Sequence, residues 1–291
     1  MPAGDDALRA HPGGGPFNTA RTIARLEQPV AYLGRLSRDR FGERLRALLA
    51  ADGVRLESVV DTEDPTTLAL AELDASGGAT YRFYMHATSA TGLTEHDALA
   101  ALPPAVGFLH VGTLRFGLEP LTSTLEAVVE RVAGSAMVLL DPNFRPEATD
   151  EPDAYRARLR RVLAHTDLLK ASHEDLEWLD PGRPPAEAVR ALLADGSAAA
   201  AVVTCGADGA LVVTGDTEVA VPAPRVTVVD TIGAGDAFGG ALLAWWRREG
   251  LDVGALSDLD ALTEATRFAC LVAARTCERP GASPPRLSEL G

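Results

Sequence analysis

Short apolar stretches that alternate with longer helical patterns constrain the fold of this chain more than any other feature. Apolar runs predict buried strands, since a strand covered on both faces has no polar side; they occur at 106–111, 136–141, 167–170, 200–204, 210–214 and 217–221. Apolar residues at helical spacing predict helices at 119–132, 153–164, 173–179, 234–248 and about 260–276. This order indicates βαβ units, a mostly parallel sheet and helices on both of its faces.

The N-terminal part continues the alternation and then departs from it once. A helix, a strand and a second helix are predicted at 16–26, 30–34 and 41–53. Residues 66–73 and 80–85, joined by DASGGA, instead predict a β-hairpin that could serve as a lid.

No internal repeat or low-complexity linker divides the chain, and GRPP at 182–185 is interpreted as a surface turn. We therefore expect one domain over 1–291, with lid elements around 8–15 and 65–86.

Composition excludes several functions. Lys plus Arg number 27 against 41 Asp plus Glu, and the net charge of −14 disfavours a nucleic-acid partner. Lys170 is the only lysine, so the chain has no P-loop. The 3 cysteines lack CxxC spacing and the 6 histidines lack metal-ligand spacing, so neither type is assigned a zinc site or a catalytic role. No apolar run approaches the roughly 18 residues of a membrane span, and the N-terminus lacks signal-peptide features. A cytoplasmic protein without a membrane partner is expected.

The string DTIGAGDAFGG carries the most informative chemistry. An apolar approach ends at Asp230, a tight turn contains Gly233, Ala234 and Gly235, and a long apolar helix begins there. Small residues at a helix start let an anion approach unpaired backbone N–H groups. Asp236 lies in the first turn, where an acid also compensates the helix dipole. Beside an anion pocket, its carboxylate could serve as the base for an attacking hydroxyl.

DTIGAGDAF resembles the C-terminal motif, DTxGAGD, of the ribokinase-like (PfkB) carbohydrate kinases, and GGGPFNTARTIARL resembles their N-terminal motif. The resemblance implies a three-layer α/β/α sandwich with a mostly parallel central sheet and a small β lid. It also implies that sugar hydroxyls are held by Gly14, Gly15 and Asn18. Asp236 would contact the substrate and act as the base, and Gly233, Ala234 and Gly235 would stabilise the charge on the phosphoryl group.

The same resemblance implies an ATP site. TCGADGA is similar to the family's TxGxxG nucleotide loop, although a hairpin turn is equally compatible with that string. Cys270 occupies the position beside the adenine at which related kinases often carry Asn, and we expect a buried structural thiol there; Cys205 and Cys277 are also expected in the core. The residues placed against ATP are Ser172, Thr204, Gly206, Gly209, Gly235 and Cys270.

Two departures occur in LLKASHEDLEWL, which resembles the region of the family's NxxE motif. Ser172 stands where Asn is usual and Asp175 where Glu is usual. Both keep oxygen ligands, so Asp175, with Glu174 as the adjacent substitute, is expected to bind Mg²⁺ through water. Lys170 is either a nucleotide-side contact or the exposed end of a strand, and we expect the latter.

Two further segments bear on ligands. DPNFRP places Asn143 and Arg145 at the carboxyl end of a predicted strand, where Arg145 is a candidate for holding a phosphate or a substrate oxygen, or is a surface arginine. The resemblance implies a monovalent-cation site, with K⁺ as the candidate ion, at Asp230 and the stretch Gly281–Ser283.

These observations predict ATP-dependent phosphorylation of a sugar primary hydroxyl. Similarity of PTTLALAELD, YRFY and AARTCERPGASPP to bacterial fructokinases favours fructose, which would become fructose 6-phosphate. The alternatives are a 2-keto-3-deoxygluconate, ribose or nucleoside kinase, or a catalytically silent sugar-binding relative. The aromatic residues of the hairpin suggest a homodimer formed through the lid.

The family's first strand and a substrate-binding Asp precede the glycine pair, but here little more than MPAGDDALRAH precedes Gly14. Either the natural start lies upstream of Met1, or the protein lacks one central strand and one sugar contact. We favour the first, because losing a buried parallel strand would expose its neighbours' backbone groups.

Overall fold

The computed structural model describes residues 10–73, 79–112, 118–144 and 152–291. The expectations for residues 1–9 and for Arg145 lie outside these ranges. The helices described are α1 (Gly15–Arg25), α2 (Arg40–Asp52), α3 (Glu95–Ala101), α4 (Leu121–Val132), α5 (Pro152–Leu163), α6 (His173–Leu179), α7 (Pro185–Asp195), α8 (Ala234–Arg248) and α9 (Leu259–Cys277). The strands are β1 (Gly34–Ser37), β2 (Val59–Thr62), β3 (Leu68–Leu73), β4 (Ala79–Tyr84), β5 (Phe108–Gly112), β6 (Met137–Asp141), β7 (Leu168–Ser172), β8 (Ala200–Thr204), β9 (Ala210–Thr214) and β10 (Thr217–Val221).

A six-stranded sheet in the order β10-β9-β8-β7-β6-β5 forms the centre of the molecule. Strands β5 to β8 are parallel neighbours, whereas β9 pairs antiparallel with both β8 and β10. The turn between β9 and β10 contains Gly215 at φ 51°, the left-handed backbone that tight hairpin turns require. The predicted mostly parallel sheet is confirmed.

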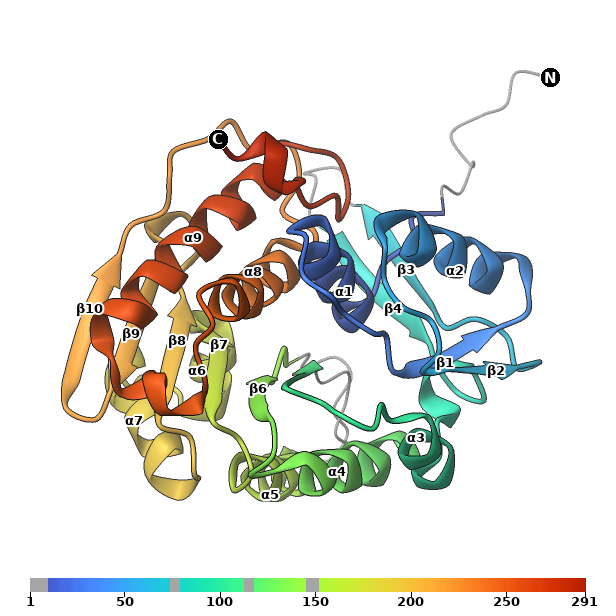
Figure 1. Cartoon of the computed structure of the whole chain (residues 1–291), viewed down its shortest axis with the longest axis horizontal. Helices are drawn as coiled ribbons and strands as arrows, with labels where there is room; N and C mark the ends of the chain where they lie inside the picture. The colour runs from blue at the N-terminus through green and yellow to red at the C-terminus, as the bar shows by residue number, and fades with distance from the viewer. Residues whose placement is uncertain (1–9, 74–78, 113–117, 145–151) are drawn as a thin grey trace.

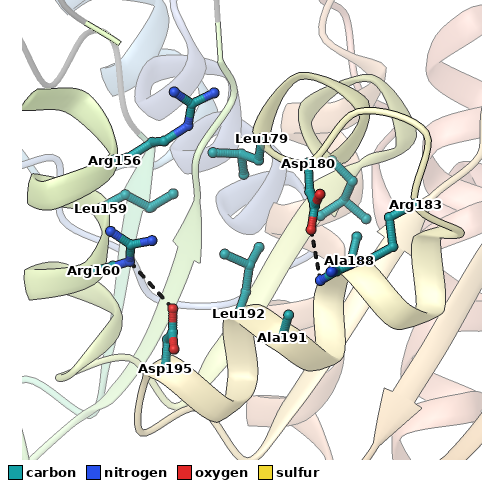
Figure 2. Close-up of a pocket in the computed structure, with 11 residues that line it drawn as sticks. Arg156, Leu159, Arg160, Leu179, Asp180, Arg183, Ala188, Ala191, Leu192 and Asp195 are labelled. Atoms are coloured by element: carbon teal, nitrogen blue, oxygen red, sulfur yellow. Dashed lines mark hydrogen bonds and ion pairs between the residues drawn. The ribbon is translucent and has the colours of Figure 1, made fainter. Parts of the chain in front are cut away.

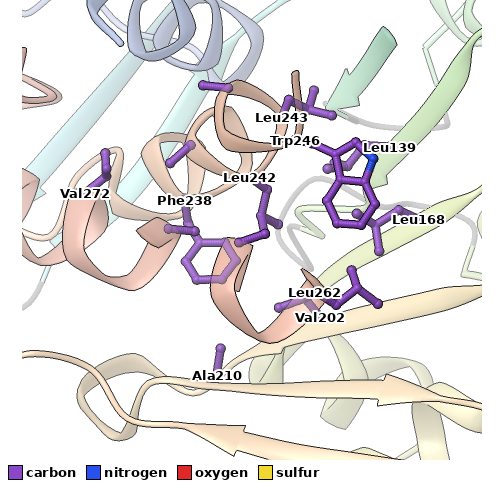
Figure 3. Close-up of a cluster of buried hydrophobic side chains, with 14 of the residues drawn as sticks. Leu139, Leu168, Val202, Ala210, Phe238, Leu242, Leu243, Trp246, Leu262 and Val272 are labelled. Carbon is purple, nitrogen blue, oxygen red and sulfur yellow. The ribbon is translucent and has the colours of Figure 1, made fainter. Parts of the chain in front are cut away.

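Helices cover both faces of this sheet (Figure 1). Alternate strand residues supply two separate cores, as the period of two in a strand requires. Leu139 and Leu168 pack with α8 and α9, and Figure 3 shows them beside Leu242 and Trp246 of α8. Strand residues on the opposite face of the sheet, among them Leu140, Leu169 and Val203, pack with α4, α5, α6 and α7. The α/β/α sandwich that the sequence predicts is therefore present.

The predicted hairpin is present. β3 and β4 pair antiparallel, and Leu68 lies opposite Tyr84 at their open end. A second small sheet is formed by β1 and β2, which run parallel. Helix α1 packs beside α8, so the N-terminal motif and the C-terminal motif lie next to each other (Figure 1).

Four local predictions were incomplete. The strand expected at 30–34 begins at Gly34, because only a single bridge between Ala31 and Arg55 precedes the paired residues. Strand β2 and helix α3 were not predicted. Helix α7 was not predicted either: the turn at 182–185 is also its start, with Pro185 in the first turn, where a missing N–H costs nothing.

In the part of the chain that the structure describes, no helix has both the length and the apolar character needed to cross a membrane.

Candidate active site

Helix α8 begins at a turn that only glycine can form without strain. Gly233 precedes it at φ 79°, and a Cβ there would lie 2.6 Å from the Cβ of Ala282. The N–H of Ala234 donates to the carbonyl oxygen of Thr231 at 3.2 Å, so this N–H would have to turn to reach an anion. Asp236 lies in the first turn of the helix. The predicted anion site is thus a partly exposed, glycine-rich helix start with an adjacent carboxylate.

Helix α1 brings the N-terminal motif to that carboxylate. The amide Nδ2 of Asn18 donates to Oδ2 of Asp236 at 2.8 Å, across 218 positions of sequence. The hydroxyl of Thr19 donates to the backbone oxygen of Asp236 at 3.2 Å. Close packing permits these bonds, since a Cβ on Gly240 would lie 2.8 Å from the Cβ of Thr22. The structure therefore joins the two motifs at one point.

The glycine pair lies at the same point. Gly14 caps α1 at φ 125°, a backbone conformation that favours glycine. A Cβ on Gly15 would lie 3.2 Å from Oδ1 of Asp236 and 3.6 Å from Nδ2 of Asn143. Asn143 itself has a positive φ of 40° just beyond the end of β6. Gly15, Asn18, Asn143 and Asp236 thus form one polar group at the carboxyl edge of the sheet.

Asp175 has a structural role at the start of α6. Its Oδ2 accepts hydrogen bonds from the N–H and the hydroxyl of Ser172, each at 2.8 Å, and its Oδ1 accepts from the N–H of Phe144 at 2.7 Å. Burial and the nearby charge of Asp141 raise the pKa of Asp175, against the lowering effect of these bonds. Glu174, its neighbour, is exposed. Of the two predicted metal ligands, Glu174 has the more accessible carboxylate.

The predicted nucleotide loop follows β8. Ser172 and Thr204 are neighbours across the parallel pair β7 and β8. Gly206 and Gly209 have φ values of 57° and 98°, and a Cβ on Gly209 would lie 2.1 Å from the carbonyl oxygen of Val221. Glycine is therefore required at 209 by packing alone. The loop is also the hairpin connection between β8 and β9, as the sequence allowed.

The three cysteines are free thiols. Cys270 is buried in α9 as predicted, and burial together with the charge of Cys205 raises its pKa to about 11. Cys205 and Cys277 are only half-buried. Cys205 still packs against the core that contains Leu140, whereas Cys277 belongs to none of the described cores, so the prediction of a core position was wrong for Cys277. Both stand next to loops, at the end of β8 and at the end of α9, where side chains keep contact with solvent.

Asp230 holds the C-terminal loop against the start of α8. Its Oδ1 accepts from the N–H of Ile232 at 2.9 Å, and its Oδ2 accepts from the N–H of Gly281 at 2.8 Å. Asp230 and the stretch 281–283, which were predicted to act together, are thus in direct contact.

Comparison with known proteins identifies the chain. Residues 5–289 match the pfkB family carbohydrate kinases. The chain belongs to this family. It is 36% identical over 248 residues to a fructokinase of Rhizobium leguminosarum bv. trifolii, covering 85% of this chain and 75% of that protein. This chain is accordingly a carbohydrate kinase, a sugar phosphotransferase, as the sequence motifs predicted.

Solved structures of related kinases have the same fold. The crystal structure of a Vibrio cholerae O395 fructokinase with fructose, ADP and calcium ion matches with a TM-score of 0.86 and 28% identity, covering 99% of this chain and 93% of that one. An aminoimidazole riboside kinase from Salmonella enterica, complexed with aminoimidazole riboside and an ATP analog, matches with a TM-score of 0.86 and 26% identity, covering 99% and 94%.

Lys170 is the main correction to the sequence analysis of this kinase. We expected the exposed end of a strand, but Lys170 is 4% exposed, and its Nζ forms an ion pair with Oδ2 of Asp141 at 2.7 Å. The sequence offered a signal, since a lone charged residue within the apolar strand LLKAS must be paired if the strand is central.

A groove of about 210 Å³ lies between α5, α6 and α7 (Figure 2). Four of its charged side chains are engaged with one another: Arg160 with Asp195 at 3.4 Å and Arg183 with Asp180 at 2.8 Å. Arg156, which also lines the groove, pairs with Asp153 outside it at 3.3 Å. None of the residues predicted to bind sugar, ATP or metal lines this groove, and we assign it no part in the kinase reaction.

Proposed function

We propose that this kinase transfers the γ-phosphoryl group of ATP to the primary hydroxyl of fructose that becomes the 6-phosphate. The hydrogen bond between Asn18 and Asp236 carries the proposal. A carboxylate can only accept, so Nδ2 of Asn18 must be the donor and Oδ1 of Asn18 remains an acceptor. Oδ1 of Asn18 is buried and has no hydrogen-bond partner in the described structure. A sugar hydroxyl is a donor of the kind it needs.

The reaction follows from this placement. The hydroxyl proton passes to the carboxylate of Asp236 while the sugar oxygen forms a bond to the γ-phosphorus, and the bond to the bridging oxygen breaks to release ADP. Backbone N–H groups at Gly233 and Gly235 lie where the positive end of α8 favours the charge of the transferring group. Gly15, by lacking a side chain, leaves room for the sugar beside Asp236.

ATP and Mg²⁺ are the cofactors we propose, with K⁺ at Asp230. The related Vibrio cholerae kinase binds ADP and calcium ion, which supports a nucleotide and a metal ion here. Mg²⁺ would neutralise charge on the ATP phosphates. Among the described residues, no group of three His, Cys, Asp or Glu side chains is arranged to hold a metal. Both carboxylate oxygens of Asp175 already accept hydrogen bonds, whereas Glu174 is exposed. We propose that Glu174 binds Mg²⁺ through water, that Asp175 holds the loop beside it, and that the phosphates supply the remaining ligands.

A riboside or nucleoside is the second candidate substrate. The riboside kinase from Salmonella enterica matches this chain with the same TM-score of 0.86 as the Vibrio cholerae fructokinase. The identity of 36% to the Rhizobium leguminosarum fructokinase favours fructose.

A coupled assay of ADP release over fructose, ribose, 2-keto-3-deoxygluconate and aminoimidazole riboside tests the substrate. We expect the highest kcat/KM with fructose; no turnover of any hexose would refute fructose. Asp236→Asn should lower kcat by about 10²- to 10⁴-fold, whereas Asp216→Asn, an exposed turn residue, should leave it unchanged. If calorimetry shows that sugar binds but MgATP gives no turnover, the chain is a silent relative.

We also propose a homodimer formed through the lid. Leu68 and Tyr84 are opposite each other and are 44% and 53% exposed, so an apolar pair faces solvent on this hairpin. Light scattering should give twice the mass of the chain, and Tyr84→Arg should give the monomer. A monomeric wild type at assay concentration would contradict the proposal.

A cytoplasmic location is proposed from the use of ATP and from the three free thiols, which persist in a reducing compartment. Fractionation of the native host would test it.

A further inference from the structure

Lys170 is a charged residue in a buried strand whose neighbouring residues are apolar. It lies within β7, where Leu169 and Ala171 are fully buried. Its side chain faces the opposite way from theirs, toward the side of the sheet covered by α8. Burying an ion pair costs more than burying an apolar residue of similar volume. Stability alone therefore does not account for the lysine.

The ammonium group points at the helix start that we assign to the phosphoryl group. A Cβ on Gly235 would lie 3.3 Å from Nζ of Lys170. Gly235 is exposed at the site, whereas Lys170 is buried behind it. The missing side chain at 235 therefore leaves a gap through which a group at the start of α8 can approach the ammonium.

The charges around Lys170 keep it ionised and also explain why a cation is needed. Burial disfavours the ammonium, but attraction to Asp141, to Asp175 and to Asp236 outweighs it, and the pKa of Lys170 lies above its ordinary value. His110 is neutral, because burial and the charge of Lys170 lower its pKa to about 3. Three carboxylates thus surround one ammonium. Without it, they would repel the phosphates of ATP.

We propose that Lys170, held in place by Asp141, contacts the phosphoryl group in transit beside Gly235 and stabilises its negative charge. The inference rests on the proposed function, which places the ATP phosphates at the start of α8. Lys170 keeps its proton throughout: the hydroxyl proton goes to Asp236, the new bond joins sugar oxygen and phosphorus, and ADP leaves. Lys170 is then a catalytic residue and Asp141 a positioning residue.

The single lysine makes a direct test possible. Protein labelled with [ε-¹³C]lysine gives one side-chain NMR signal, that of Lys170. We expect this signal to shift on addition of MgADP, and further on addition of aluminium fluoride, a mimic of the transferring phosphoryl group, together with fructose. A signal that moves with neither addition would overturn the proposal. This measurement uses the wild-type protein, so it does not depend on whether a variant folds.

Kinetics supply the second test. Lys170→Met should lower kcat by about 10²- to 10³-fold, with the KM for fructose changed less than about threefold, and Lys170→Arg should recover part of the loss. Asp141→Asn should also lower kcat and should move the lysine signal in the absence of ligand. Arg38→Met, at a side chain 62% exposed, is the matched control and should change nothing. Wild-type kcat in Lys170→Met would overturn the proposal.

The two proposals fail differently. If the wild type turns over none of the sugars, the proposed function is wrong. The lysine signal then still reports whether nucleotide phosphates and their mimic meet Lys170.

Discussion

Replacing Gly240 by Ala should separate the two helices that form the site. Gly240 lies one turn after Asp236 on the buried face of α8. An added Cβ would lie 2.8 Å from the Cβ of Thr22 and 2.9 Å from the backbone oxygen of Thr19, both on α1. Carbon atoms normally approach no closer than about 3.5 to 4.0 Å, so α1 must move away from α8 by roughly 1 Å.

This displacement has a small effect on stability and a large one on activity. Overpacking costs about 1 to 3 kcal/mol, and the better helix propensity of Ala returns about 1 kcal/mol. The free energy of unfolding should therefore fall by at most about 2 kcal/mol. The bond between Asn18 and Asp236, 2.8 Å long, would open beyond hydrogen-bond range. A misplacement of about 1 Å lowers turnover by about 10²-fold.

Urea unfolding and the coupled kinase assay measure both effects on the same protein. Gly107→Ala is the matched control, because a Cβ at that position would meet nothing within 4 Å. We expect Gly107→Ala to retain the turnover and stability of the wild type. If Gly240→Ala retains wild-type kcat and becomes more stable, the contact between α1 and α8 does not position the base.

Two further predictions concern buried charge and pH. Asp52→Asn should lower the free energy of unfolding, measured in urea, by about 3 to 5 kcal/mol, because this carboxylate is 4% exposed and forms ion pairs at 2.7 and 2.9 Å with two arginines of α1. The control Asp61→Asn changes a side chain that is 45% exposed and should lower it by less than about 1 kcal/mol. Equal losses in the two variants would contradict the argument from burial. The pKa of His110 is lowered to about 3 in the folded protein, so the unfolded chain takes up its proton first as the pH falls below about 6.5, and the wild type should lose about 2 kcal/mol from this group between pH 7 and pH 5. Urea titrations at the two pH values should show that His110→Phe lacks this part of the loss in free energy of unfolding. His86→Asn, a change at an exposed histidine, should behave as the wild type. If His110→Phe loses as much free energy of unfolding as the wild type between pH 7 and pH 5, the histidine is not held neutral.

Local patterns in the sequence determined the elements and the chemistry at the start of α8. Apolar spacing identifies most of the sheet and helices because each pattern depends only on near neighbours in the chain. The string GAGD indicates a helix start with N–H groups and a carboxylate for the same reason. Helix α7 was readable too, since Ala188, Val189, Leu192 and Leu193 follow helical spacing after Pro185.

Only the tertiary structure decided which of these local features meet. A pattern shows that a face is buried but does not name the partner, so it could not show that Asn18 reaches Asp236 from 218 positions away. It also could not decide the environment of Lys170, which is set by Asp141 on the neighbouring strand and by Gly235 at the start of α8. The ionisation and the role of a charged side chain follow from these long-range neighbours, because charge interactions depend on distance in space and on burial.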